Sequence, residues 1–283
     1  MITSIERGFQ NPRPLPASWL RPTWDFAFPL HEPEARAQAS RLAERYMVLC
    51  SNRMGGVSEG VFASMNLGLS QGDSPEHVAE NRKRLAQYLP APARYLRLVH
   101  GSDCLRSADL DRADTALPLA DAAVLTKAGQ SLVMLTGDCL PIVLADARGR
   151  ALGMAHAGWR GLAAGVIESA VAAMRDATEP KACLIAWIGP CIGPAAFEVG
   201  EDVLTAFPAQ ERGASFFRPR PAHKAEQRWL GDLLALARRR LAQAGVTAVG
   251  GGLWCTWHDR ARFFSHRRQS GGGRFATAIA LRA

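Results

Sequence analysis

The sequence predicts a mixed α/β fold in which short buried strands are combined with helices and hairpins. Apolar runs of four or five residues, such as 132–135 and 141–145, end at or near Gly or Pro, which is typical of buried strands. Other segments, such as 162–174, carry apolar residues at helical spacing. This mixture fits neither a regular βαβ alternation nor an all-β fold, so we expect a mixed α/β or α+β sandwich.

In chain order, a Pro-, Arg- and Trp-rich extension over residues 1–46 comes first and includes an expected helix at 32–45. One domain over residues 47–283 follows it. Residues 208–228 are rich in Pro and Arg and are expected to form a loop. We expect strands at 46–50, 96–99, 121–125, 132–135, 141–145, 151–155, 182–188 and 275–281, and helices at 74–89, after Gly161, at 201–207 and at 229–244.

Composition points to a cytoplasmic protein. The chain has 283 residues with 48% apolar content, and no run suggests a signal peptide or a membrane span. Its six cysteines form no CxxC pair, so we expect reduced thiols rather than a disulfide framework. Nothing in the sequence specifies an oligomeric state.

The chain is basic, with a net charge of +8 and 34 Lys and Arg residues. Such a balance is compatible with nucleic acid, with phosphorylated or phosphate-using substrates, or simply with solvated basic faces. We do not expect nucleic acid as a partner, because the sequence contains no helix-turn-helix pattern, zinc knuckle or interleaved basic and aromatic stripe.

The most informative stretch is a predicted hairpin between the strands 141–145 and 151–155. A centre near 147.5 would pair residues whose numbers sum to 295, which places Cys139 opposite His156 with Cβ atoms about 5 Å apart. A thiol and an imidazole at that separation suit a shared metal ion or a nucleophile–base pair. His100 is placed similarly, directly after the apolar run 96–99.

Several motifs occur in an order that resembles the YfiH-type laccase-domain family, whose members are mainly assigned as purine nucleoside phosphorylases. The resemblance covers roughly residues 47–283. Its motifs are SNRMGGVS from Ser51, MNLG from Met65, VHGSD from Val99, TGDCLP from Thr136, HAGWRG from His156, IGPCIGP from Ile188, FEVG from Phe197, and CTW with FFSHRR between Cys255 and Arg268.

The resemblance implies an α/β/β/α sandwich and matches His100, Cys139 and His156 to the family's metal ligands. Two imidazoles and one thiolate with an open fourth position are typical of catalytic zinc, although copper is also possible. The implied reaction is phosphorolysis of a purine nucleoside, with adenosine deamination as a companion activity. The partners are therefore a purine nucleoside and phosphate.

Roles for further residues follow from the chemistry of that reaction. Phosphate requires cationic donors, for which Arg53 and Arg160 are candidates, and Asn52 in the same motif as Arg53 is a further substrate contact. Deamination requires a carboxyl group that carries protons. Asp138 is the first candidate for this role and Glu198 the second; Asp138 could equally only orient its neighbour Cys139.

Three alternatives remain open at this point. A Cys–His hydrolase acting on peptidoglycan precursors would use Cys139 as nucleophile and His156 as base. A copper-dependent polyphenol oxidase would need several coppers, for which three ligands do not suffice. A non-enzymatic nucleotide or nucleic-acid binder would use the basic surface and would bind in a salt-sensitive manner.

Overall fold

The computed structural model describes residues 15–28, 32–112, 119–223 and 226–282 of the chain. Two sheets form its body, and both mix parallel and antiparallel pairing. The four-stranded sheet has the order β1 (Tyr46–Cys50), β13 (Phe275–Leu281), β5 (Ser131–Thr136) and β2 (Ala93–Tyr95). The six-stranded sheet has the order β12 (Ala248–Gly251), β8 (Leu184–Ile188), β6 (Leu140–Asp146), β7 (Leu152–Ala157), β4 (Ala122–Leu125) and β3 (Cys104–Leu105).

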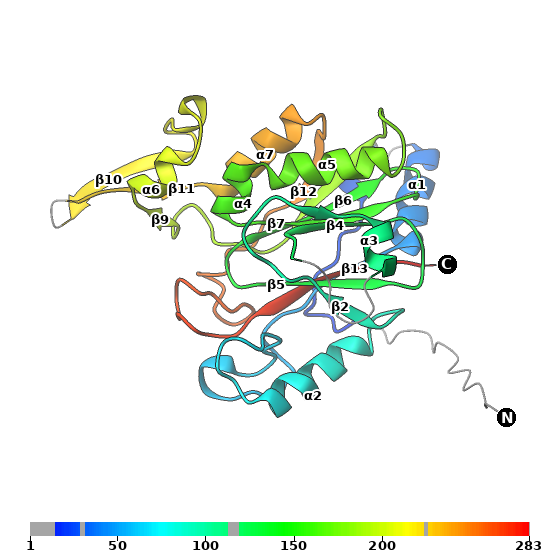
Figure 1. Cartoon of the computed structure of the whole chain (residues 1–283), viewed down its shortest axis with the longest axis horizontal. Helices are drawn as coiled ribbons and strands as arrows, with labels where there is room; N and C mark the ends of the chain where they lie inside the picture. The colour runs from blue at the N-terminus through cyan, green and yellow to red at the C-terminus, as the bar shows by residue number, and fades with distance from the viewer. Residues whose placement is uncertain (1–14, 29–31, 113–118, 224–225, 283) are drawn as a thin grey trace.

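Helices cover the outer faces of both sheets, so the expected α/β/β/α arrangement is confirmed (Figure 1). One apolar core lies between the two sheets and contains Met134, Val143 and Ile279. The helices are α1 (Pro33–Arg45), α2 (Pro75–Ala86), α3 (Ser107–Arg112), α4 (Trp159–Ala164), α5 (Val166–Asp176), α6 (Glu201–Thr205) and α7 (Leu233–Gln243), with short 3-10 turns at Asp25–Ala27, Gly60–Phe62 and Ala209–Glu211.

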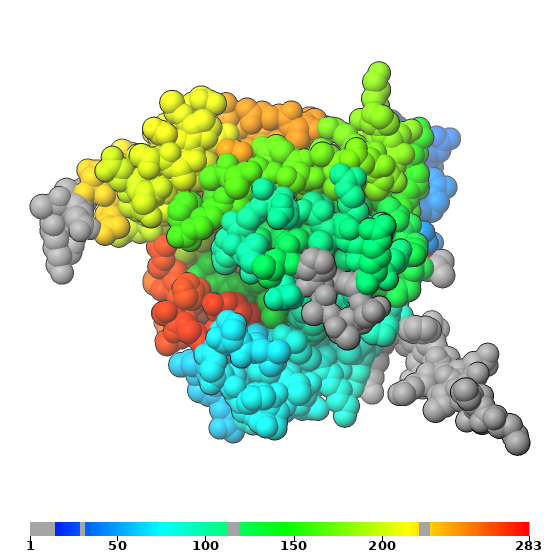
Figure 2. Space-filling view, viewed as in Figure 1, coloured from blue at the N-terminus to red at the C-terminus, as the bar shows by residue number. Residues whose placement is uncertain are grey.

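A third sheet of three strands projects from this body (Figure 1) and forms the yellow lobe in Figure 2. Its strands are β10 (Phe217–His223), β11 (Glu226–Gly231) and β9 (Glu198–Val199). The expectation of a loop over 208–228 is therefore wrong from Phe217 onward, while 208–216 form turns and one short 3-10 turn. Two prolines are tolerated in β10 because it is the edge strand of this sheet, where a missing N–H costs no ladder bond.

The expected hairpin forms between β6 and β7, but its register differs from the predicted one. Paired residues sum to 297, as in Pro141 with His156 and Ala145 with Leu152. The loop 147–150 is centred between residues 148 and 149 rather than at 147.5, and Gly149 in it has φ of 82°. Cys139 and His156 are therefore diagonal neighbours on one face instead of directly opposite partners.

Two further expectations need correction near the site. Residues 96–99 form no regular strand, because the backbone N–H of Val99 binds a side-chain carboxylate, that of Asp121, instead of a neighbouring strand. The helix expected after Gly161 begins earlier, at Trp159, and is interrupted at Gly165, whose φ of 92° ends α4 and starts α5. Glycine adopts this left-handed conformation without the steric cost of a Cβ.

The described part of the N-terminal segment, residues 15–28 and 32–46, is built into the body of the molecule. Trp24 is 1% exposed in the core between the sheets, and α1 lies alongside β1. The Tyr46 hydroxyl lies 2.8 Å from the carbonyl oxygen of Asp146 and 2.9 Å from that of Ala151, so it ties β1 to the β6–β7 hairpin of the other sheet. No helix in the described ranges has the length and apolar content needed to cross a membrane.

Candidate metal site

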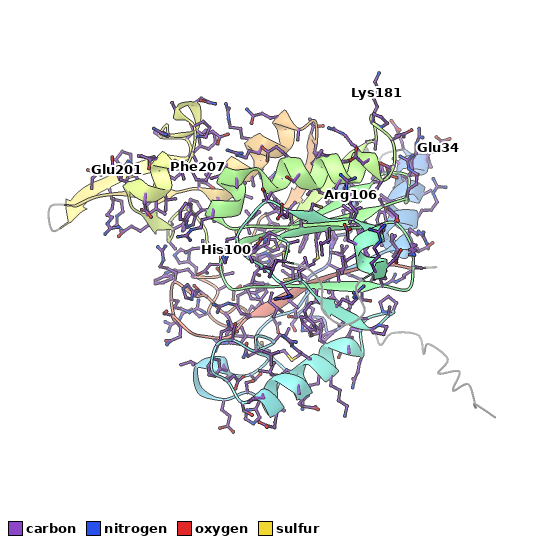
Figure 3. The ribbon with its side chains drawn as sticks, in the orientation of Figure 1. Glu34, His100, Arg106, Lys181, Glu201 and Phe207 are labelled. Carbon is purple, nitrogen blue, oxygen red and sulfur yellow. The ribbon has the colours of Figure 1, made fainter. Side chains whose placement is uncertain are left out.

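Two imidazoles and one thiol converge at the open end of the β6–β7 hairpin, opposite its loop. The ligand atoms of His100, Cys139 and His156 all lie within 4.8 Å of one another. The Cys139 Sγ is 3.9 Å from His100 Nε2, and the two imidazole rings meet edge to face at 4.9 Å. His156 is buried and His100 is exposed, so the cluster opens to solvent on the His100 side. His100 lies between the two main sheets, near α4 (Figure 3).

A single buried carboxylate, that of Asp121, binds the imidazole of His156 and the backbone that carries His100. It lies 2.8 Å from His156 Nδ1, and it accepts hydrogen bonds from the backbone N–H groups of Val99, His100 and Gly101 at 3.1, 2.9 and 2.8 Å. His100 has φ of 61°, a conformation that is unfavourable for a side chain with a Cβ and is held here by these bonds. With Nδ1 donating to the carboxylate, His156 presents Nε2 to the cluster.

Electrostatics favour a thiolate at the centre of the cluster. Burial by itself would raise the pKa of the Cys139 thiol, but the charge of His156 and hydrogen bonds with His100 and His156 outweigh it, so the pKa lies below its ordinary value. Burial by itself would lower the pKa of His156, but the Cys139 charge and the Asp121 hydrogen bond raise it. A thiolate beside imidazoles is the donor set that soft and borderline metal ions prefer.

Gly158 is the residue across the hairpin from Cys139. A Cβ at this position would lie 2.9 Å from the Cys139 Sγ and 3.2 Å from His100 Cδ2. The first contact is too short for a Cβ unless the thiol shifts, and the second is tight, so glycine lets the thiol and the imidazole come together without displacement.

The cluster lies in a pocket of about 580 Å³, within the range that small organic ligands occupy. Three parts of the chain form its walls: the 68–82 region, the strand ends that carry the cluster, and the 266–274 segment. These parts meet on the face that Figure 2 presents. Leu96, Leu98 and Leu135 provide apolar wall, while Arg82 and Arg274 provide positive charge.

A family model described as multi-copper polyphenol oxidoreductase laccase matches residues 47–282. The chain belongs to this family. The family resemblance expected from the motifs is thus confirmed.

Relatives within this laccase family carry a different functional name. The chain is 50% identical over 244 residues to a purine nucleoside phosphorylase of Xylella fastidiosa (strain Temecula1), covering 82% of the chain and 90% of that relative. It is 43% identical over 233 residues to purine nucleoside phosphorylase YfiH of Escherichia coli (strain K12), covering 82% and 92%. The crystal structure of Neisseria meningitidis protein NMB0706 has a TM-score of 0.75 at 38% identity, covering 84% of this chain and 95% of that one.

The two candidate proton carriers occupy different environments. Asp138 lines the pocket beside Cys139, and its carboxylate accepts hydrogen bonds from the Thr256 hydroxyl at 2.5 Å and the Arg267 backbone N–H at 2.7 Å. Glu198 lies on β9 outside the pocket lining and is paired with Arg220. The structure therefore brings Asp138, but not Glu198, to the cluster of His100, Cys139 and His156, which we call the metal-type cluster.

The predicted substrate contacts do not line this pocket either. Asn52 is buried and bonds the Ser18 carbonyl and the Met54 N–H. Arg53 lies in a separate small pocket. The Arg160 guanidinium stacks on the Trp159 ring at 4.2 Å, exposed at the start of α4.

Sequence reasoning missed Asp121, Arg274 and Arg82. The signal for Asp121 was a charged residue directly before a fully apolar run, where an unsatisfied carboxylate would be costly.

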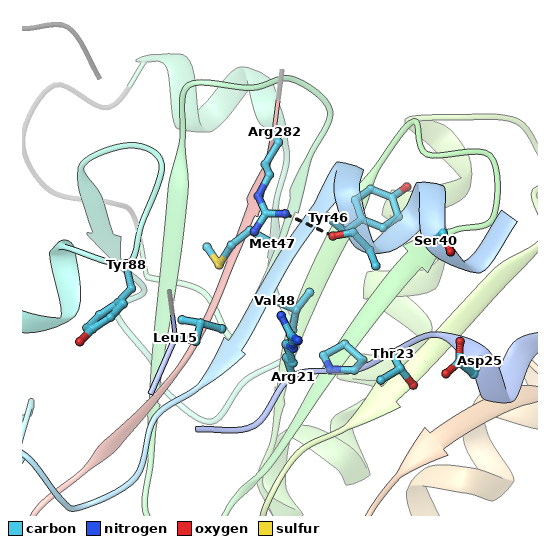
Figure 4. A pocket seen from close by; sticks show the side chains of 12 residues that line it. Leu15, Arg21, Thr23, Asp25, Ser40, Tyr46, Met47, Val48, Tyr88 and Arg282 are labelled. Carbon is cyan, nitrogen blue, oxygen red and sulfur yellow. Dashed lines mark hydrogen bonds between the residues drawn. The ribbon is translucent and has the colours of Figure 1, made fainter. Parts of the chain in front are cut away.

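Another pocket, of about 370 Å³, lies between the N-terminal segment and β1, where Arg282 donates to the Ala43 carbonyl at 3.2 Å (Figure 4). Its lining includes no His or Cys, so we place the chemistry at the 580 Å³ pocket.

Proposed function

We propose that this protein is a metal-dependent purine nucleoside phosphorylase with a companion adenosine deaminase activity. The observation that carries the proposal is the His100–Cys139–His156 cluster, which opens into a nucleoside-sized pocket that also contains arginines. The relatives named purine nucleoside phosphorylase support the same reaction. In that reaction the C1′–N9 bond of the nucleoside breaks, a C1′–O bond to phosphate forms, and the purine leaves with a proton.

The donor set fits zinc. Zinc in catalytic sites takes three protein ligands and keeps one position open, and a carboxylate commonly fixes its histidine, as Asp121 fixes His156. When bound, zinc supplies Lewis-acid chemistry. Copper accepts the same donors, and we propose zinc because three protein ligands with one open position are the arrangement of zinc sites in enzymes.

Arg274 and Arg82 are the cations we assign to phosphate. Arg274 is close to Gly137, where an added Cβ would lie 3.0 Å from Arg274 Cδ, and its Nη2 is 3.4 Å from His266 Nδ1. Arg82 is fixed by stacking on Tyr95 and by a bond to the Leu67 carbonyl. This assignment moves the phosphate contact away from Arg53 and Arg160, because Arg82 and Arg274 line the pocket and these two do not.

The apolar side of the pocket suits a purine base. Leu69 is 60% exposed at its edge, and Leu96, Leu98 and Leu135 continue that surface inward. A flat heterocycle covers apolar surface while its ring nitrogens remain available to polar groups. For the companion deamination, in which adenosine and water give inosine and ammonia, we assign proton transfer to Asp138, since Thr256 and Arg267 hold its carboxylate in place.

The proposal is tested on purified protein. We expect about one zinc per chain by elemental analysis, and phosphate-dependent release of hypoxanthine from inosine. Cys139→Ala and His156→Ala should lose both the zinc and the activity. Arg274→Gln should keep the zinc and raise KM for phosphate by tenfold or more, because a charge-assisted contact is lost. Full zinc occupancy in the Cys139 and His156 variants would contradict the site as assigned.

A cysteine hydrolase is the second candidate. Asp121 binds His156 and His156 interacts with Cys139, as the acid, base and nucleophile of a catalytic triad do. The presence of His100 as a second imidazole favours the metal, since a nucleophile needs only one base. Iodoacetamide distinguishes them. A metal-bound thiolate is protected until zinc is chelated, whereas a free nucleophile is alkylated at once.

Polyphenol oxidation, which the family description names, has weaker support. The described ranges contain one group of three or more His, Cys, Asp or Glu side chains that could hold a metal, and a laccase-type reaction needs several coppers.

We propose that the protein acts in the cytoplasm, where its six cysteines, all free in the structure, would stay reduced.

A further inference from the structure

Three arginines gather in a second pocket, which is lined in part by the same 264–274 segment that contributes His266 and Arg274 to the 580 Å³ pocket. Arg53, Arg260 and Arg268 line this pocket of about 190 Å³, together with Ser265 and Gln269. It shares no lining residue with the 580 Å³ pocket. From the sequence, Arg53 was expected to act at the catalytic site, so its position here calls for a separate role.

The arginines are held in place by backbone carbonyls rather than by carboxylates. Arg268 donates to the carbonyls of Thr256, Trp257 and Phe263 at 2.6 to 2.8 Å. Arg53 donates from Nε to the Ala63 carbonyl at 2.9 Å and lies over the Phe264 ring at 4.8 Å. These bonds fix the guanidinium groups while leaving other N–H groups free to bind a ligand.

Positive charge is concentrated in this pocket, and no carboxylate lines it to neutralise the arginines. None of the eight residues that line the pocket is Asp or Glu, and nearby Asp259 is engaged with Arg262. Burial and then the neighbouring arginines lower the pKa of both Arg53 and Arg268. Crowding of like charges costs free energy, which an anion between them would remove.

We propose that Arg53, Arg260 and Arg268 form a binding site for a phosphate group, either as inorganic phosphate or as a phosphate monoester. Guanidinium groups match phosphate oxygens in pairs, and the Ser265 hydroxyl is at hand as a further donor. The volume is below that of pockets for drug-sized molecules, which favours a small anion. The site does not depend on the reaction proposed above.

Crystals of the zinc-loaded protein soaked in tungstate, a tetrahedral phosphate analogue, locate the site directly. We expect anomalous density between Arg53, Arg260 and Arg268. An empty arginine pocket in crystals that admit tungstate elsewhere would overturn the proposal.

Calorimetry with inorganic phosphate and, separately, with ribose 5-phosphate tests the site in solution. The measurements use the Arg274→Gln background, so that binding in the 580 Å³ pocket does not obscure the result. Arg260 is the residue to change, because its side chain makes no hydrogen bond to another described residue and is exposed. We expect Arg260→Gln to weaken binding of at least one of the two anions by tenfold or more.

Arg36→Gln is the matched control, since it removes the same charge from an exposed position on α1. Binding in this control should equal that of the Arg274→Gln background. Binding that is equal in the Arg260 and Arg36 variants, or absent for both anions in the background protein, would overturn the site. Preference for inorganic phosphate or for ribose 5-phosphate identifies the source of the phosphate group.

Discussion

At the scale of single residues, the metal site depends on a carboxylate that is not itself one of the proposed metal ligands, that of Asp121. Asp121 fixes the ring of His156 through Nδ1 and fixes the backbone of His100 through its N–H. The imidazole of His156 and the backbone that carries His100 are therefore in place before any ligand arrives. Such preorganisation reduces the conformational freedom that ligand binding would otherwise have to remove.

Asp121→Asn should therefore weaken zinc binding by about 10- to 100-fold, the usual effect of losing the partner of a metal-binding histidine. An amide cannot accept from His156 and from three backbone N–H groups at once. Competition with a chromophoric chelator measures the affinity. Asp111→Asn is the control, because its carboxylate is exposed and pairs with Lys127 at the surface. Equal affinities in the two variants would contradict this role.

The sequence predicted some of these residues better than others, for physical reasons. Cys139 and His156 belong to one hairpin, so local pairing was enough to bring them together despite the two-residue error in register. Asp121 bonds to residues 20 to 35 positions away, and no local pattern encodes such contacts. Arg53 was predicted from its motif, but a motif does not specify which pocket a long side chain enters.

At the scale of elements, burial decides which segments were predictable. Strands β1 and β13 were expected at their observed limits because every residue in them is buried and apolar runs are easy to recognise. Strands β10 and β11 were missed because β10 has an exposed, Pro- and Arg-containing edge and is held by pairing with β11, which in turn pairs with β9. Their signal lies in that long-range pairing and not in their composition.

The Tyr46 hydroxyl offers a test of how the two sheets are joined. Tyr46→Phe should lower the free energy of unfolding by about 1 to 2 kcal/mol, because a buried hydrogen bond to the hairpin is lost. Tyr95→Phe is the matched control: the buried Tyr95 hydroxyl has no partner within the described ranges, so its removal should not destabilise the protein. Urea denaturation of both variants provides the measurement. A larger loss for Tyr95→Phe would contradict the interpretation.

At the scale of the whole molecule, the N-terminal segment completes the core. It places Trp24 between the sheets, in ring contact with Tyr46 at 6.1 Å, and α1 contacts the hairpin loop through Arg45 and Gly149. The segment was expected from the sequence as an extension to one domain, with no function assigned to it. Its contacts support a role in stability.

Trp24→Ala should therefore cost about 3 to 5 kcal/mol of unfolding free energy, the range for removing a buried Trp or Phe side chain. Trp24 does not line the pocket that holds His100, Cys139 and His156, so variant protein that remains folded should bind zinc with unchanged affinity. Phe26→Ala, at a side chain that is 40% exposed, should cost much less. Urea titrations and zinc titrations of the two variants together test this assignment. Loss of zinc affinity in folded Trp24→Ala would contradict a purely structural role.

The absence of a side chain at Gly158 also bears on whether a metal site can be assigned to a homologue from its sequence. Since a Cβ there would lie 2.9 Å from the Cys139 sulfur, a methyl group at this position would force the thiol to shift from its place in this compact trio of donors. In a homologue with alanine or anything larger at the matching position, we expect the thiol or the imidazole to lie elsewhere than it does here, even if all three donor residues remain in its sequence. That one position can therefore indicate whether the metal chemistry should be transferred to a newly sequenced homologue along with the name.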